Sequence, residues 1–300
     1  MQTVDRGTSS TGHPGPGAAM HAADQPTPAA LKDLAELFAR GPAAILTGAG
    51  ISTDSGIPDY RGAGTPPRTP MSIAQFSSDP HYRQRFWAGA RVGALRMAGL
   101  RPNPGHEAVA RLEHAGHLTG VITQNVDGLH GAAGARNVAE LHGSGSTMRC
   151  FTEGHRFSRA DTMAWFDVAN PGFAERNAGA MLTPDGDAAV QEVAGVRVPV
   201  CPACGGMLRP DVVYFGEHVP KQVFAHAEQI VAESGLLLIA GSSLAVNTGV
   251  RLVHRAEGRG IPVAVINRGP TAVDRRPSLR VRIDGGTSET LTALADALGA

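Results

Sequence analysis

Short, continuous apolar runs that end in glycine or a polar residue recur along this chain. They cover residues 43–47, 120–123, 211–215, 236–240 and 262–266. Because apolar residues fill nearly every position of a run, and not every second position, the runs predict strands covered on both faces, as in a parallel sheet. Helical spacing of apolar residues separates most of the runs. We expect these helices over 104–115, 221–234, 248–257 and 288–298. This alternation predicts an α/β fold with a doubly wound, Rossmann-like parallel sheet.

Two segments interrupt the alternation, and we expect them to form a smaller lobe inserted into the sheet domain. They are residues 62–97, where a proline-rich loop leads into helical pieces, and residues 148–209, which hold all three cysteines. The predicted sheet domain then comprises 29–61, 98–147 and 210–300.

The N-terminal residues 1–28 are rich in Gly, Pro, Ser, Thr and Ala and have no apolar periodicity. Such a composition predicts a disordered tail. Ordered structure is expected to begin near Thr27 and Pro28, because threonine caps helices and proline is favoured at the first helical position.

Composition limits the class of protein. Lys+Arg and Asp+Glu both number 27, which removes the electrostatic case for a protein that coats nucleic acid. No apolar stretch approaches the length of a membrane span, so we expect no membrane partner. The three cysteines argue against a disulfide framework and favour a cytoplasmic location. The sequence does not indicate an oligomeric state.

The first apolar run is followed by a glycine-rich segment, Gly48–Gly62. A Gly-x-Gly turn after a first strand lets backbone amides approach a pyrophosphate. The next glycine, Gly56, follows Gly50 by six residues, whereas the ordinary dehydrogenase fingerprint has three. We therefore expect a long loop that presents Asp59 and Arg61 to a cleft.

These residues resemble the first motif of the sirtuin family, the NAD-dependent protein lysine deacylases. Further motifs of that family are matched in the same order across roughly residues 30–298. The matching segments are 123–130, 140–143, 211–217, 241–244 and 266–271. The resemblance implies that NAD is consumed as a co-substrate and that the partner is an acyl-lysine protein or peptide. Asn103-Pro104 and an insert at 184–187 resemble the class II branch.

The resemblance assigns NAD contacts to residues that follow the apolar runs. They are Gly48, Ala49, Gly50, Asp59, Tyr60, Arg61, Gln124, Asn125, Asp127, Gly241, Ser242, Ser243, Asn267, Arg268 and Gly269. Asn125 and Asp127 would hold the nicotinamide carboxamide, and Gln124 would contact the ribose. Ser242 and Asn267 would contact the adenosine ribose; serine and asparagine after strands are also ordinary helix caps.

The resemblance also implies the chemistry. The acyl-lysine oxygen attacks the nicotinamide ribose, nicotinamide leaves, and a deprotonated ribose hydroxyl attacks the resulting alkylamidate, so that the acyl group ends on ADP-ribose. His142 is the candidate general base, because a neutral imidazole with a pKa near 6.5 suits that step. The predicted catalytic residues are therefore His142, Asn125 and Asp127. Since the chain has twelve histidines, the choice of His142 depends on the surrounding motif.

Substrate contacts are expected along a second motif. By resemblance, Val213, Tyr214, Phe215 and Gly216 would pair with the substrate backbone as an added strand, a mode that gives affinity with little sequence selectivity. Val246 would line the acyl-lysine channel. The tyrosine–arginine pair of succinyl-preferring relatives is not evident, which leaves the acyl preference open.

A structural zinc site is expected with an altered ligand set. The family usually carries two Cys-x-x-Cys pairs, and Cys201 and Cys204 form one of them. Cys150 begins the other, but the next cysteine position holds Glu153, and His155 lies two residues further on. Three thiolates with one imidazole or carboxylate can complete a tetrahedral site. Imidazole is the better partner for zinc beside thiolates, so we favour His155; a metal-free lobe is the alternative.

Other activities are compatible with the same pocket. A mono-ADP-ribosyltransferase would use the same NAD-binding residues, and a non-catalytic ADP-ribose or NAD reader would bind without turnover. An ordinary NAD dehydrogenase is disfavoured, because the third glycine is displaced and the expected downstream acidic residue is lacking.

Overall fold

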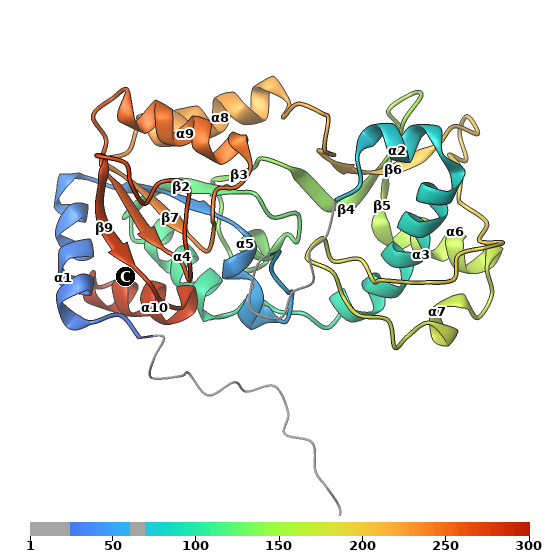
Figure 1. The fold of residues 1–300 in the computed structure, drawn as a ribbon, viewed down its shortest axis with the longest axis horizontal. Coiled ribbons are helices and arrows are strands. Elements are labelled where there is room, and N and C mark those ends of the chain that lie inside the picture. Colours follow the sequence, from blue (N-terminus) through green and yellow to red (C-terminus); the bar gives the residue numbers. More distant parts are fainter. Residues whose placement is uncertain (1–24, 61–69) are drawn as a thin grey trace, which may run out of the picture.

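The computed structural model of the chain describes residues 25–60 and 70–300, which form two lobes side by side along the long axis (Figure 1). The strands are β1 (Ala43–Thr47), β2 (Leu118–Thr123), β3 (Val138–Glu140), β4 (Gly143–Cys150), β5 (Arg156–Ser158), β6 (Leu208–Val212), β7 (Leu236–Ala240), β8 (Val263–Ile266) and β9 (Leu279–Ile283). The helices are α1 (Pro28–Leu37), α2 (Ile73–Ser78), α3 (Pro80–Met97), α4 (Pro104–His114), α5 (Leu129–Ala132), α6 (Arg159–Ala169), α7 (Phe173–Arg176), α8 (Lys221–Ala232), α9 (Asn247–Glu257) and α10 (Thr287–Ala297). Short 3₁₀ turns cover Phe38–Arg40, Ala49–Ile51 and Thr53–Ser55.

The larger lobe is built on a six-stranded sheet with the order β3-β2-β1-β7-β8-β9. All five strand pairs are parallel. The strand order reverses between β1 and β7, and in doubly wound sheets ligands bind in the crevice outside the carboxyl ends of the strands at such a switch point. The predicted doubly wound parallel sheet is confirmed.

Both faces of this sheet are covered by helices, which explains the continuous apolar runs. In β1, Ala43 and Ile45 pack into one core with α1, α4 and α10. The alternate residues Ala44 and Leu46 pack into a second core with α8 and α9. The two layers lie on opposite sides of the strands in Figure 1. The predicted helices α4, α8, α9 and α10 begin and end within two residues of expectation.

Local capping fixes where two of these helices begin. Thr27 accepts a hydrogen bond from the N–H of Ala30, and Pro28 is the first residue of α1. Asn103 caps α4, and its side chain accepts from the N–H groups of Gly105 and His106. A side-chain oxygen at this position satisfies helical N–H groups that have no intrahelical partner.

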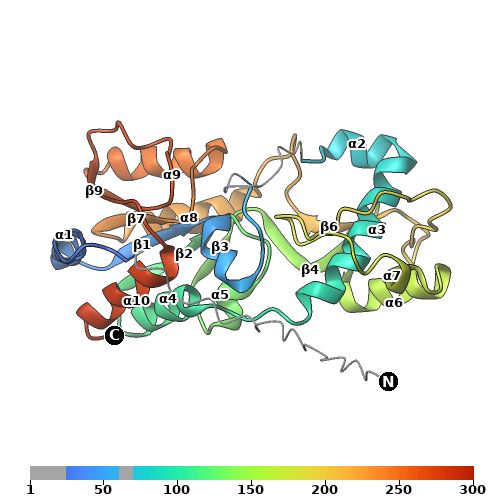
Figure 2. The ribbon, with the colours of Figure 1, turned by 60° about the horizontal axis from the view of Figure 1, so that its bottom comes forward.

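The smaller lobe combines helices with a three-stranded antiparallel sheet in the order β5-β4-β6. Its core contains aromatic side chains of α2, α3 and α6, including Phe76, Trp87 and Phe166. Figure 2 shows α2, α3, α6 and α7 around this sheet, away from the parallel sheet. The smaller lobe therefore has a hydrophobic core of its own.

One predicted strand is placed wrongly. We expected residues 211–215 to join the parallel sheet, but β6 ends at Val212 and pairs with β4 in the smaller lobe. The reason is that Tyr214 is buried in the smaller lobe's core, so this apolar run packs there and not between helical layers. The boundaries expected at 147 and 209 fall inside β4 and β6, and the division into domains stays a proposal. The greater part of the predicted tail, residues 1–24, lies outside the described residues.

Candidate active site

Two loops meet at the switch point of the sheet, one after β1 and one after β7. The N–H of Gly50 donates to the carbonyl of Gly241 over 2.8 Å. A Cβ on Gly50 would lie 2.8 Å from the Cα of Gly241, and a Cβ on Gly48 would lie 2.8 Å from the Cβ of Ser242. Both positions require glycine, because real Cβ atoms do not approach so closely. The structure thus brings the Gly48–Gly50 segment and residues 241–243 together.

Several backbone amides of the first loop donate hydrogen bonds within the protein. Besides the Gly50–Gly241 contact, the N–H of Ile51 donates to the carbonyl of Gly48 over 3.1 Å. The N–H of Ser52 donates to the carbonyl of Ala49 over 3.1 Å. We expected this turn to offer its amides to a pyrophosphate. The glycines also allow the two loops to pack against each other, and the contact with a pyrophosphate stays a prediction.

The hydroxyl of Ser52 contacts two residues of the polar segment after β2. The Oγ of Ser52, which is 1% exposed, donates to Oδ2 of Asp127 over 2.7 Å and accepts from Nδ2 of Asn125 over 3.1 Å. Nδ2 of Asn125 also donates to the carbonyl of Gly48 over 3.1 Å. These contacts consume the donors of Asn125, so its carbonyl oxygen and the carboxylate of Asp127 are the groups that can receive a ligand's N–H.

His142 follows β3 and lies beside the same segment. Its Nδ1 lies 2.9 Å from the carbonyl oxygen of Gln124, and because a carbonyl only accepts, Nδ1 carries the proton. Nε2 of the neutral ring is then an acceptor. Burial lowers the pKa of His142 below its ordinary value, an effect that the bond to Gln124 opposes. The imidazole is therefore neutral at physiological pH and can accept a proton.

Gln124 links the two sides of the switch point. Its side-chain oxygen accepts from the hydroxyl of Ser242 over 2.6 Å. The same hydroxyl accepts from the N–H of Leu244 over 3.2 Å, and Leu244 has φ 54°, a left-handed conformation that is uncommon outside glycine. With its oxygen engaged, the Gln124 side chain retains an amide donor.

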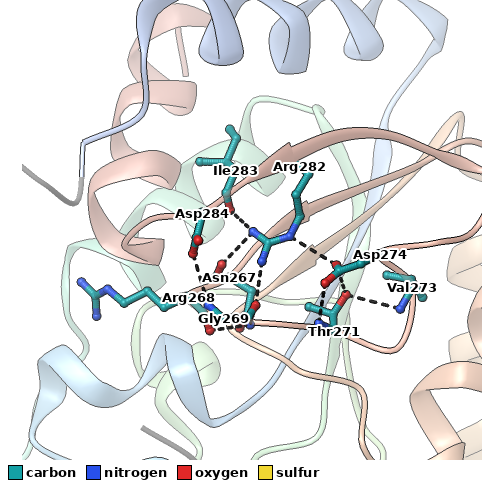
Figure 3. A network of polar contacts seen from close by, with 9 residues as sticks. All are labelled: Asn267, Arg268, Gly269, Thr271, Val273, Asp274, Arg282, Ile283 and Asp284. Atoms are coloured by element: carbon teal, nitrogen blue, oxygen red, sulfur yellow. Dashed lines mark hydrogen bonds and ion pairs between the residues drawn. The ribbon is translucent and has the colours of Figure 1, made fainter. Parts of the chain in front are cut away.

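Asn267, Arg268 and Gly269 follow β8 and form a turn organised by Arg282 (Figure 3). The guanidinium of Arg282 donates to the carbonyl of Asn267 over 2.8 Å and to that of Gly269 over 2.6 Å. Asp274 accepts from the same guanidinium over 3.3 Å. Asn267 is 7% exposed, and its Nδ2 bonds to the carbonyls of the next two residues. This turn is therefore rigidly built, but it uses the amide donors of Asn267 itself.

The remaining predicted residues of the first loop lie toward the smaller lobe. The hydroxyl of Tyr60 donates to the carboxylate of Asp185 in the insert at 184–187. Burial and the neighbouring carboxylates of Asp185 and Asp187 raise the pKa of Tyr60, which keeps the phenol protonated. Asp59 lies next to Tyr60 in the chain, and the predicted residue Arg61 lies outside the described residues.

The predicted substrate residues differ in exposure and in backbone pairing. The N–H of Val213 donates to the carbonyl of His142 over 2.8 Å, which places this segment beside the candidate base. Tyr214 is buried, whereas Phe215 and Val246 are exposed by 51% and 36%. Gly216 has φ 93°, where glycine is favoured. The carbonyl of Phe215 accepts from the N–H of Ile73 over 3.0 Å, so part of this edge is already paired. Phe215 and Val246 are the members of this set with the most exposed apolar side chains.

All three cysteines cluster with one histidine. The ligand atoms of Cys150, His155, Cys201 and Cys204 lie within 4.8 Å of one another. The Sγ atoms of Cys150 and Cys204 are 3.5 Å apart, and Sγ of Cys201 is 3.5 Å from Nδ1 of His155. Such spacings are close to the edges of a tetrahedron around zinc with bonds of about 2.0–2.3 Å. Three thiols and an imidazole are also the ligand chemistry that zinc prefers.

Glu153 does not join this cluster through its carboxylate. A backbone hydrogen bond at Glu153 instead lowers the pKa of the Cys150 thiol. The structure thus favours His155 over Glu153 as the fourth ligand.

Two buried residues of the site were missed by sequence reasoning. Ser52 contacts both Asn125 and Asp127, and Nε2 of His106 lies 3.4 Å from the Ser52 hydroxyl. The available signal was the position of His106, three residues before Val109 on the buried side of a helix capped by Asn103. A buried histidine there requires polar partners, which the loop after β1 supplies.

Comparisons with known proteins agree on one family. The Sir2 family model matches residues 48–248. NAD-dependent protein deacetylase 1 of Mycobacterium avium strain 104 is 53% identical over 258 residues, which cover 85% of this chain and 91% of that protein. NAD-dependent protein deacetylase 1 of Streptomyces coelicolor is 44% identical over 273 residues, which cover 90% of each chain.

Solved structures are similar over nearly the same extent. A Sir2 protein with a p53 peptide and NAD+ has a TM-score of 0.73 at 28% identity, covering 90% of this chain and 98% of that one. A Sir2 protein bound to an acetylated peptide has a TM-score of 0.72 at 27% identity, with the same coverage. In addition, no helix among residues 25–60 and 70–300 is long and apolar enough to cross a membrane.

Proposed function

This chain belongs to the Sir2 family, and we propose that it is an NAD-dependent protein-lysine deacylase. It cleaves NAD to nicotinamide and transfers the acyl group of an acyl-lysine protein or peptide to ADP-ribose. The observation that carries this proposal is the position of His142, a neutral imidazole with an accepting Nε2, beside the polar segment Gln124–Asp127. Class II membership stays a prediction.

The residues at the sheet edge fit a dinucleotide. When bound, NAD supplies an activated ribose from which nicotinamide can leave. The carbonyl oxygen of Asn125 and the carboxylate of Asp127 accept hydrogen bonds from a carboxamide, because Ser52 and Gly48 occupy the Asn125 donors. The amide donor of Gln124 is available to ribose hydroxyls, since Ser242 occupies its oxygen.

His142 removes a proton in the second half of the reaction. Its Nε2 accepts the proton of a ribose hydroxyl, and its Nδ1–H stays bonded to Gln124 throughout. That bond fixes the tautomer and favours the imidazolium that forms. General-base catalysis of this kind contributes about 10²- to 10⁴-fold to a rate.

We further propose which residues contact the rest of the dinucleotide and the substrate peptide. Gly48–Gly50 and residues 241–243 surround the middle of the dinucleotide, and Asn267, Arg268 and Gly269 lie on its adenosine side. Asp59 and Tyr60 contact NAD from the end of the first loop, and the predicted NAD contact of Arg61 concerns a residue outside the described ones. Substrate peptide lies along Val213–Gly216 and contacts Val246. These assignments follow the order of the strand ends at the switch point.

The smaller lobe is proposed to hold a structural zinc ion through Cys150, His155, Cys201 and Cys204. Such an ion joins β4 to the turn before β6 and thereby stabilises the lobe. The three thiols, none of them in a disulfide, also support a cytoplasmic location.

The test combines the enzyme, NAD and acetyl-lysine peptides with other acyl chains included. We expect nicotinamide release together with an acyl-ADP-ribose product, detected by mass spectrometry. An acceptor protein that gains ADP-ribose without losing an acyl group would instead identify a mono-ADP-ribosyltransferase. Absence of nicotinamide release with every acyl chain would overturn the proposal.

A further inference from the structure

Two buried histidines lie behind the Asn125–Asp127 segment, and the mechanism above does not use them. His106 on α4 is 0% exposed and His130 on α5 is 2% exposed. Their ring centroids are 5.0 Å apart with planes at 66°, an edge-to-face contact. Burying two imidazoles side by side is costly unless their nitrogens serve particular partners.

The hydrogen bonds of His106 run in one direction. The N–H of Asn103 donates to Nδ1 of His106 over 3.4 Å, so Nδ1 is an acceptor and Nε2 carries the proton. Nε2 lies 3.4 Å from Oγ of Ser52. Since the single hydroxyl proton of Ser52 points to Asp127, its oxygen must accept from His106. The order is therefore Asn103 to His106 to Ser52 to Asp127.

His130 begins a second ordered chain. Its Nε2 lies 2.9 Å from Oγ1 of Thr47, which donates to Oγ1 of Thr123 over 2.9 Å. The Thr123 hydroxyl oxygen also accepts from the N–H of Asn125 over 3.1 Å. Because Thr47 gives its proton to Thr123, it must accept from Nε2–H of His130. This chain ends on the backbone of Asn125.

Both rings are neutral, which these chains require. Burial lowers the pKa of His106 to about 4, although the charges of Asp127 and Asp54 act in the opposite sense. Burial and the neighbouring His106 lower the pKa of His130 to about 3. The other nitrogen of His130, Nδ1, is buried without a hydrogen-bond partner among the described residues. A proton on that nitrogen would be buried without an acceptor.

We propose that His106 and His130 are positioning residues for the nicotinamide end of the site, acting through Ser52 and through Thr47 and Thr123. Each neutral ring donates one hydrogen bond and thereby fixes the direction of the hydroxyl bonds that lead from Ser52 to Asp127 and from Thr47 to Thr123. The acceptors of Asp127 and Asn125 are then turned to the ligand. This inference deepens the proposed function and depends on it for the identity of the ligand.

The test compares NAD with ADP-ribose, which lacks nicotinamide, by titration calorimetry. In His106→Leu, which removes the donor to Ser52, we expect the affinity for NAD to fall about tenfold, the effect of one buried hydrogen bond to a charged network. The affinity for ADP-ribose should change less than about twofold. His106→Gln restores a donor and should recover most of the NAD affinity. His130→Leu should also weaken binding of NAD while leaving the affinity for ADP-ribose nearly unchanged.

A purely structural role would weaken both ligands together, and that result, or unchanged NAD binding, would overturn the inference. If the wild-type protein releases no nicotinamide, only the proposed function fails. The comparison of the affinities for NAD and ADP-ribose still tests the role of the two histidines.

A second measurement needs no variant. Nitrogen-15 NMR of the wild-type chain should show both rings as neutral Nε2–H tautomers between about pH 5 and pH 8. A protonated ring or an Nδ1–H tautomer at either position would contradict the proposal even if the leucine variants fail to fold.

Discussion

His142 and Gln124 are joined by a hydrogen bond of 2.9 Å from the imidazole Nδ1 to the backbone carbonyl, and this bond leaves Nε2 as the accepting nitrogen. The carbonyl belongs to the residue directly after β2, next to Asn125. The segment of the sheet edge that contains Gln124 and Asn125 therefore also sets the tautomer of His142.

Replacing the base should separate the two halves of the reaction. In His142→Ala we expect deacylation to fall about 10²- to 10⁴-fold, because no group remains to accept the ribose proton. Exchange of labelled nicotinamide into NAD should continue, since bond cleavage precedes the step that needs the base. Equal loss of exchange and deacylation, with unchanged NAD binding, would contradict this role.

The pH dependence of kcat/KM follows from the pKa of the same residue. The base must be unprotonated, so activity falls as pH drops through the pKa of the free enzyme. Because burial lowers the pKa of His142 below about 6.5, we expect this acid limb to have its midpoint below that pH and a level rate at neutrality. Steady-state measurements of kcat/KM against pH with an acyl-lysine peptide give this midpoint. A midpoint above about 7 would show that another group controls the rate.

The loop contact at the switch point should not tolerate a side chain. In Gly50→Ala, the new Cβ would lie 2.8 Å from the backbone of Gly241, so one loop must move. We expect a loss of stability of about 1–3 kcal/mol and at least tenfold weaker NAD binding. Gly179→Ala is the matched control, because nothing lies within 4 Å of the added carbon. Similar melting temperatures and affinities for both variants would refute this account of the loop.

The sequence could predict the parallel sheet because each strand of its centre is covered on both faces. The same reasoning failed for residues 211–215. In this run Val212 and Tyr214 pack into the core of the smaller lobe. This reasoning also missed β9, in which Arg280 and Arg282 alternate with apolar residues at the sheet's edge. Apolar runs indicate burial, but they do not indicate which core buries them.

The candidate site was predictable where polar residues follow strands, as at Gln124 and His142. Ser52 and His106 were not, because their roles depend on a contact between a loop and a helix that lie far apart in sequence. The choice of His155 as the candidate fourth metal ligand likewise needed the fold, since spacing along the chain alone allowed Glu153 as well as His155.

Metal content should depend on His155 and not on Glu153. We expect about one zinc per chain in the wild-type protein, loss of most of it in His155→Ala, and recovery in His155→Cys, because thiolate is an equally good zinc ligand. Glu153→Gln is the matched control and should keep its zinc. Elemental analysis measures the zinc content of each variant, and melting temperatures measure its effect on stability. Full zinc in His155→Ala, or zinc loss in Glu153→Gln, would identify a different ligand set.

Acid should destabilise the fold through the two buried histidines. Their pKa values are about 4 for His106 and about 3 for His130, whereas an unfolded histidine titrates near 6.5. Because the folded-state values are depressed, the stabilisation is fully present above about pH 6.5 and is lost as pH falls toward the folded values. Between pH 6.5 and pH 5 the free energy of unfolding should drop by about 1.6 kcal/mol for each histidine.

Urea unfolding at several pH values tests this dependence with a variant that removes one titrating group. His130→Gln should lose about 1.6 kcal/mol less than the wild-type chain over that interval. His81→Gln is the control, because His81 is solvent-exposed on α3, and its slope should match that of the wild type. If His130→Gln follows the wild-type slope, the protonation of His130 does not couple to folding, and the burial of a neutral ring at this position would need another explanation.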